Sequence, residues 1–190
     1  MSDKKYPTGG EFLLSETAPE KAFTPEDFDE NQRMFSSTVD GFVATVIDPV
    51  RDDLEYKGNT ALGKGLLLKA AEMGLLMVDI PEVYGGMGSN KATVMLVSER
   101  MANSGSFAVT HGAQSGIGTL PIVYYGTEEQ KTKYLPGIAT GALMTCYALT
   151  ETGSGSDAMN AATTAKLSDD GTHYVLNGSK QFITNASYSD

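Results

Sequence analysis

The chain has 190 residues, of which 41% are hydrophobic and 20% are charged, a composition typical of a globular protein with one or two domains. Its 14 basic and 24 acidic residues give a net charge of −10, which argues against a nucleic-acid partner bound through its phosphates. The single cysteine, Cys146, excludes an internal disulfide, and we expect no signal peptide, no membrane-spanning segment and a cytoplasmic location.

The first part of the chain predicts an irregular arm followed by a helix. Residues 1–23 show no periodicity and contain a short apolar piece at residues 12–14. Thr24 is a capping residue, Pro25 suits the first helical position, and two acids follow. Apolar residues then recur at helical spacing, so we expect an amphipathic helix from Thr24 that ends near Pro49.

Further helical patterns continue to about residue 140. We expect a helix over residues 62–73 stopped by Gly74, and another from a cap at Ser89 through Met101 that is apolar and buried on most sides. Residues 107–118 are unusually small for a helix, which allows either close packing or a slender ligand near the backbone. A polar helix over residues 127–135 should end at Pro136 and Gly137.

After residue 140 the pattern changes to short β-prone runs. Strands are expected over residues 144–150, 161–167, 173–176 and 180–184, with hairpin signals at residues 169–171 and 177–178. About four strands are too few for a closed barrel. The predicted fold class is therefore α+β. An irregular arm (1–23) precedes an all-α domain (24–139) and the first part of an antiparallel β-barrel domain (140–190), and we expect a fragment.

A loop of glycines and hydroxyls at residues 151–157 follows the first of these runs. Small residues let backbone N–H groups approach an anion, although ordinary solvated turns use the same residues. The loop lacks the spacing of the common phosphate-binding and dinucleotide fingerprints. Neither His111 nor His173 has neighbours at metal-ligand spacing, so we expect no metal site.

Four ordered motifs resemble those of the acyl-CoA dehydrogenases, the flavin enzymes that desaturate acyl-CoA thioesters. PEVYGGMG (81–88) resembles the family's PExYGGxG loop, and GTEEQKTKYLP (126–136) resembles its GTEEQKxxYLP helix. LTETGSGSD (149–157) resembles LTEPGAGSD, and GSKQFITN (178–185) resembles GxKxWITN. The arm around residues 9–12 is similar to that of the larger, very-long-chain-like bacterial members. This resemblance implies a helical amino-terminal domain, a β-barrel middle domain and a helical carboxy-terminal bundle.

The resemblance also implies FAD as cofactor and assigns site residues. Contacts to the flavin would come from Tyr147, Leu149 and Thr150, contacts near the pyrophosphate and acyl-CoA from Gly155 and Ser156, and contacts to the isoalloxazine from Phe182, Ile183 and Thr184. Gly112 and Ala113 are candidate walls of a slot for a long acyl chain. Two departures from the motifs, Thr152 for proline and Phe182 for tryptophan, are compatible with flavin.

The family carries its catalytic glutamate in the carboxy-terminal bundle, so no residue of this chain is expected to be the base. The resemblance further implies fatty acid β-oxidation, an electron-transferring flavoprotein as acceptor, and a homo-oligomer for the complete protein. Two alternatives share the fold: a non-catalytic acyl-CoA or flavin-binding module, and a flavin oxidase or monooxygenase of the same superfamily.

Overall fold

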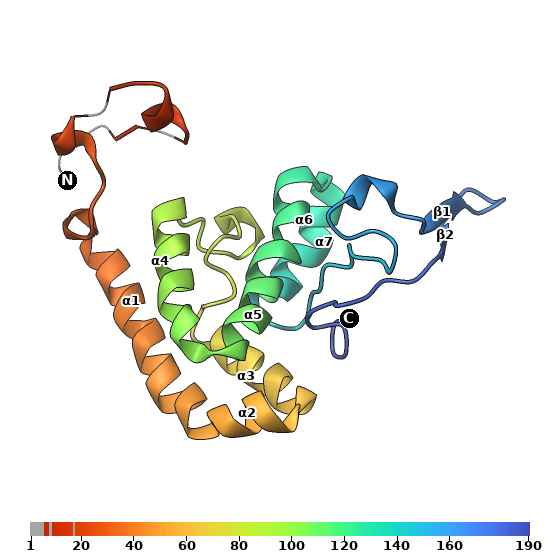
Figure 1. Cartoon of the computed structure of the whole chain (residues 1–190), viewed down its shortest axis with the longest axis horizontal. Helices are drawn as coiled ribbons and strands as arrows, with labels where there is room; N and C mark the ends of the chain where they lie inside the picture. Colours follow the sequence, from red (N-terminus) through yellow and green to blue (C-terminus); the bar gives the residue numbers. More distant parts are fainter. Residues whose placement is uncertain (1–5, 8, 17) are drawn as a thin grey trace.

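The computed structural model describes residues 6–7, 9–16 and 18–190 and shows a helical body followed by an extended segment with a hairpin (Figure 1). The helices are α1 (Glu30–Phe42), α2 (Arg51–Lys57), α3 (Thr60–Glu72), α4 (Lys91–Met101), α5 (Ser106–Gly112), α6 (Leu120–Tyr125) and α7 (Glu128–Ala139). Strands β1 (Thr164–Leu167) and β2 (Tyr174–Asn177) pair antiparallel. Helices followed by an antiparallel sheet confirm the predicted fold class.

Short 3-10 turns, at Glu11–Leu13, Pro19–Lys21 and Pro25–Asp27, precede α1. The prediction that the first long helix begins at Thr24 is wrong, because Thr24 and Asp27 close only a single turn. The helix begins at Glu30 instead, since Asp29 and Gln32 form a complete capping box. Asp29 Oδ1 accepts a bond from the Gln32 backbone N–H at 2.8 Å, and Gln32 Oε1 accepts one from the Asp29 N–H at 3.0 Å.

The helical path continues past Pro49, where the sequence predicts its end. A π-helical stretch (Val43–Ile47) and a 3-10 turn (Asp48–Val50) lead from α1 directly into α2. Pro49 lies in the first turn of the new segment, where no backbone N–H is needed for a helical hydrogen bond. α1 and α2 meet at a corner of the body (Figure 1).

α3 agrees with its prediction. It stops at Gly74, whose φ of 76° is a left-handed conformation that favours glycine. The loop that follows contains a 3-10 turn, Glu82–Tyr84.

α4 differs from its prediction in two respects. Its cap is Asn90 and not Ser89, because Asn90 Oδ1 accepts a bond from the Thr93 backbone N–H at 3.0 Å. The helix is also not buried on most sides, since the face with Met95 and Ser98 is exposed in the described chain.

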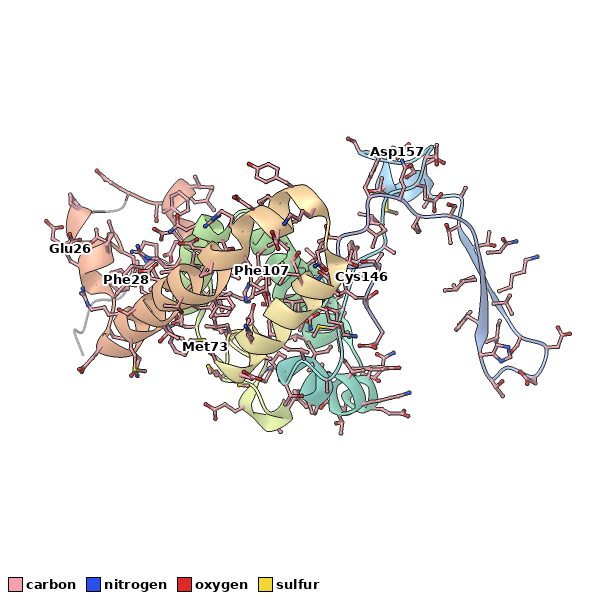
Figure 2. The ribbon with its side chains drawn as sticks, turned by 90° about the horizontal axis from the view of Figure 1, so that it is seen from below. Glu26, Phe28, Met73, Phe107, Cys146 and Asp157 are labelled. Carbon is pink, nitrogen blue, oxygen red and sulfur yellow. The ribbon has the colours of Figure 1, made fainter. Side chains whose placement is uncertain are left out.

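One apolar core joins α1, α3, α4 and α5. Its fully buried side chains include Val39, Phe42, Ile47, Leu67, Leu75, Met101 and Phe107. The ring centroids of Phe42 and Phe107 lie 5.9 Å apart, and Figure 2 shows Phe107 inside the helical body. This core fixes α5 within the helical body.

α7 runs through the proline that was expected to close it. The cap at Thr127 forms as part of a capping box with Gln130, but the helix includes Pro136 and ends at Ala139, so the predicted end is wrong. Leu135 and Ile138 are fully buried in a second apolar cluster with Ile80. Burial of these two side chains outweighs the one helical hydrogen bond that Pro136 cannot donate.

Only part of the predicted strand pattern forms. The hairpin signal at residues 169–171 is confirmed, since β1 and β2 flank this turn and Gly171 has a φ of 69°. Residues 144–150 and 180–184 are extended or turning without a ladder partner in the described chain, so these two strands and the hairpin at residues 177–178 are wrong. A β-strand needs a neighbour for its backbone hydrogen bonds.

Within the described ranges, no helix is long and apolar enough to cross a bilayer.

Candidate functional site

The glycine loop at residues 151–157 is closed by its own backbone. The Glu151 N–H donates to the Ser154 carbonyl at 2.9 Å, the Ser154 N–H donates back at 3.1 Å, and Ser154 Oγ donates to the Asp157 carbonyl at 2.6 Å. The N–H groups of Gly155 and Ser156 donate to no acceptor among the described residues. Apart from its two chain neighbours, no described residue has an atom within 4 Å of the position that a Cβ would take on Gly155. Gly155 and Ser156 are exposed, so the loop offers accessible N–H donors, which is what an anionic ligand requires.

A buried carboxylate holds this loop in place. Glu151 is 7% exposed, and its two oxygens accept bonds from the backbone N–H groups of Ala162 at 2.7 Å and Thr163 at 3.0 Å. Lys180 Nζ donates to the same carboxylate at 2.8 Å and to the Leu149 carbonyl at 2.9 Å. The Lys180 side chain, together with the other donors, lowers the pKa of Glu151 to about 2.

The segment at residues 181–185 is held at both ends. The Gln181 N–H donates to the Thr150 carbonyl at 2.9 Å. Asn185, which is buried with a φ of 70°, donates through Nδ2 to the Thr110 carbonyl at 3.0 Å and to the Thr145 carbonyl at 3.3 Å. Asn185 therefore holds this segment against α5, through Thr110, and against the chain that leads into the glycine loop, through Thr145.

Between these anchors, Phe182 is 87% exposed and has a φ of 58°. A bulky residue in the left-handed region is uncommon and marks a position under constraint. Tyr147 and Leu149 are also exposed, whereas Thr150, Ile183 and Thr184 are partly buried. The structure thus links the two predicted flavin-contacting segments through the Gln181 and Lys180 bonds. In Figure 2, Cys146 lies beside the helices and Asp157 lies at the outer end of the loop.

Gln114 fixes the start of the site segment on the helical body. It is fully buried in a π-helical stretch, Ala113–Ile117, that continues α5. Its Nε2 donates to the Leu143 carbonyl at 3.0 Å, and its Oε1 accepts a bond from the Thr145 N–H at 2.7 Å. The chain therefore leaves the helices in one defined direction.

A cavity of about 250 Å³ lies between α4 and the α5 region. Its lining is mainly apolar, with Leu75, Val78, Val94, Met95, Val97 and Leu120, and it includes Gly112, Ser115 and Gly116. Among described residues, no atom lies within 4 Å of a Cβ placed on Gly112 or Gly116, so close helix packing does not account for these two glycines. Ala113 is 3% exposed and is not part of the lining.

Two polar features border this cavity. Lys91 Nζ contacts both carboxylate oxygens of Asp79 at 2.6 Å and lies 5.2 Å from the centroid of the Tyr124 ring. His111 is buried, and its Nε2 lies 2.9 Å from the Leu75 carbonyl. Because a carbonyl can only accept, Nε2 is the nitrogen that carries the proton.

Among the described residues, no three His, Cys, Asp or Glu side chains gather as metal ligands.

Burial lowers the pKa of His111 below its ordinary value of 6.5. The unfolded chain therefore takes up a proton that the folded chain rejects, and the free energy of unfolding should fall as the pH drops below 6.5. Urea denaturation at stepped pH measures this slope. His111→Gln, which keeps a donor for Leu75 but does not titrate, should flatten it, and an equal slope in both proteins would contradict this account.

Sequence reasoning did not identify the residues that hold the site together. Gln114, Lys180 and Asn185 were passed over, although Lys180 and Asn185 lie inside a motif that was singled out. Gln114 has a long amide side chain in a helix of small residues. This contrast could have identified it, since a buried amide needs hydrogen-bond partners.

The sequence matches two family descriptions. "Acyl-CoA dehydrogenase, N-terminal domain" matches residues 29–142, and "Acyl-CoA dehydrogenase, middle domain" matches residues 146–190.

Individual relatives agree with these matches. A protein of Bacillus subtilis (strain 168) named "Probable acyl-CoA dehydrogenase" is 47% identical over 96% of this chain and 30% of its own length. The crystal structure of an acyl-CoA dehydrogenase complexed with FAD from Bacillus anthracis is 49% identical, with a TM-score of 0.91 over 96% of this chain and 31% of that chain. In a structure of the electron transferring flavoprotein of Acidaminococcus fermentans, a chain is 33% identical, with a TM-score of 0.80 over 88% of this chain and 43% of that one. This chain therefore spans less than half the length of each of these relatives.

Proposed function

We propose, from the premise that this chain belongs to the acyl-CoA dehydrogenase family, that it is the amino-terminal part of an FAD-dependent enzyme that desaturates acyl-CoA thioesters. The observation that carries the proposal is the glycine loop, whose Gly155 and Ser156 N–H groups have no acceptor in the described chain, linked to a segment that presents an exposed aromatic ring. The length of the relatives supports a longer parent protein, since the chain spans 30% of the first of them.

The residues present fit FAD. The N–H groups of Gly155 and Ser156 would hold the pyrophosphate, because they have no other acceptor in the described chain. Tyr147 and Leu149 offer exposed apolar surface to the ring system, and Thr150 and Ile183 lie beside them on the two linked segments. Phe182 would border the isoalloxazine with its exposed ring, and Thr184 with its hydroxyl. When bound, FAD supplies the acceptor for a hydride from the β-carbon of the acyl chain.

The chain's own residues would bind and orient the reactants. The N–H groups of Gly155 and Ser156 would hold the negatively charged pyrophosphate at one position. Ser156 Oγ is available to the acyl-CoA. The apolar cavity beside Gly112 excludes water from the acyl tail. The carboxylate that removes the α-proton would come from outside residues 1–190, as the family resemblance implies.

The cavity supports a preference for long acyl chains. Gly112 and Gly116 add no side chains that would narrow the cavity, and each buried methylene of a tail contributes about 0.8 kcal/mol. Ala113 lies outside the lining, so the substrate contact rests on Gly112.

We further propose a role in fatty acid β-oxidation in the cytoplasm, an electron-transferring flavoprotein as acceptor, and assembly of the complete protein as a homo-oligomer.

Steady-state assays of the full-length protein test this function. The protein should contain FAD and reduce an artificial electron acceptor with saturated acyl-CoA substrates, without consuming oxygen at a comparable rate. Oxygen consumption coupled to acyl-CoA would instead identify an oxidase of the same superfamily. Absence of FAD and of any turnover would leave a binding module.

Replacing Thr184 by valine should shift the flavin absorption spectrum and lower activity while the fold stays intact. The Thr184 hydroxyl bonds to no described atom and is free for the cofactor. Valine keeps the shape but removes one hydrogen bond, worth about 1 kcal/mol. Spectra and kcat of the full-length variant measure this, with Thr184→Ser as the control that keeps the hydroxyl. A valine variant with a wild-type spectrum and rate would show that Thr184 is elsewhere.

A further inference from the structure

Three separate stretches of the chain meet at the Glu151 carboxylate. The first is the glycine loop, which begins at Glu151. Two backbone bonds join Glu151 to Ser154 within this loop. The second is the start of the hairpin, where Ala162 and Thr163 donate their N–H groups to the carboxylate. The third is the segment before Phe182, from which Lys180 donates its ammonium. The Glu151 carboxylate therefore joins the glycine loop of residues 151–157 to the segment of residues 180–185.

Lys180 makes the connection in two directions. Its Nζ reaches Glu151 at 2.8 Å and the Leu149 carbonyl at 2.9 Å, so a single ammonium joins two positions of the segment that carries the loop. Next to it, the Gln181 N–H donates to the Thr150 carbonyl at 2.9 Å. These bonds fix the register between residues 149–151 and residues 180–181.

The geometry fits close packing around this pair. A Cβ on Gly178 would lie 2.2 Å from Thr163 Oγ1, so the chain passes Thr163 closely only because residue 178 is glycine. The Glu151 side chain is 8% exposed and the Lys180 side chain 24%, so solvent screens the pair only weakly. Loss of Lys180 would leave the Glu151 carboxylate with its two backbone N–H donors but without an opposite charge. Loss of Glu151 would leave Lys180 bonded to the Leu149 carbonyl alone.

We propose that Glu151 and Lys180 are a positioning pair that fixes the glycine loop against the segment of residues 181–184 and thereby sets the affinity for FAD. This inference rests on the proposed function. A ligand that spans both segments binds more tightly when they are already held in the bound arrangement, because less conformational freedom is lost on binding. The acyl cavity between α4 and α5 contains neither residue, so the pair acts on the cofactor and not on the acyl tail.

The Glu151 carboxylate also stays charged down to acidic pH. The pKa of Glu151 is lowered from 4.5 to about 2, so its contribution to the folded state is fully present above pH 4.5 and is lost as the pH falls toward 2. FAD affinity should therefore show no titration of Glu151 near neutral pH.

The test is the dissociation constant of FAD from the full-length protein, measured by quenching of flavin fluorescence. We expect Glu151→Gln and Lys180→Met each to weaken FAD binding about tenfold, and the double variant to be far less than a hundredfold weaker, because both changes break one interaction. Lys180→Arg should recover part of the affinity. At saturating FAD, the KM for acyl-CoA should rise by a clearly smaller factor than the dissociation constant of FAD, because Ser156 is one contact of acyl-CoA whereas FAD spans both segments.

Glu129→Gln is the matched control, since Glu129 is an exposed acid on α7 and bonds to no described residue. If Glu151→Gln does not fold, Lys180→Met alone tests the inference, because the lysine side chain is more exposed and its replacement disturbs the fold less. Wild-type FAD affinity in the folded variants, or a raised KM for acyl-CoA in place of weaker FAD binding, would overturn the inference. A wild-type protein that binds no FAD would overturn the proposed function itself.

Discussion

Replacing Gly112 by leucine in the full-length protein is expected to lower kcat/KM for long acyl-CoA substrates about 100-fold, with little change for short ones. Gly112 lines the cavity of about 250 Å³, and no described atom lies within 4 Å of a Cβ placed on it. Leucine therefore extends into free space. It displaces about four methylenes of the tail, roughly 3 kcal/mol in all, which corresponds to about two factors of ten in rate.

Gly41→Leu is the control for this experiment. Gly41 also lies within a helix, is exposed and has no described atom within 4 Å of a Cβ, but it is remote from the cavity lining. Leucine favours a helix over glycine by about 1 kcal/mol, so neither change should unfold the protein. The cavity would be ruled out as an acyl site by a wild type that prefers short chains, or by Gly112→Leu with the same chain-length profile as Gly41→Leu.

Phe107→Ala is expected to lower the free energy of unfolding by about 3–5 kcal/mol, a large fraction of the stability of a typical domain. Phe107 is fully buried and packs against Phe42 and His111 at centroid distances of 5.9 and 6.4 Å. Alanine would remove most of this buried surface and leave a cavity at the centre of the helical body. Urea denaturation followed by helical circular dichroism measures the loss.

The same change at Phe182 provides the comparison. Because Phe182 is 87% exposed, Phe182→Ala should change the free energy of unfolding by no more than about 0.5 kcal/mol, while it alters the flavin spectrum of the full-length protein. Equal losses of stability at both positions would contradict the assignment of Phe107 to the core and of Phe182 to a ligand-facing surface.

The helices could be predicted where local signals and burial agree. α3 has an apolar period and a glycine stop, and α7 begins directly after Thr127, where the polar helix is predicted to begin. The errors lie where tertiary burial decides. Pro136 was read as a helix end, yet Leu135 and Ile138 are buried on either side of it, and packing keeps the helix intact.

The β-prone region shows the opposite limit. Alternating residues predict that a segment is extended, but a strand also needs a ladder of backbone bonds, and residues 144–150 form none in the described chain. The motifs located the glycine loop and the segment before Asn185, whereas the bonds through Glu151, Lys180 and Gln114 depend on distances between residues about 30 apart in sequence. Spacing in a single sequence cannot supply such distances.

The most direct measurement of the central claim is the absorbance of the bound flavin when the full-length protein is mixed with a saturated acyl-CoA in the absence of oxygen. The account predicts that the visible flavin absorption is lost and that an equal amount of the α,β-unsaturated acyl-CoA is formed. A protein that holds FAD and binds acyl-CoA, but whose flavin keeps its oxidised spectrum with a range of chain lengths, would contradict it.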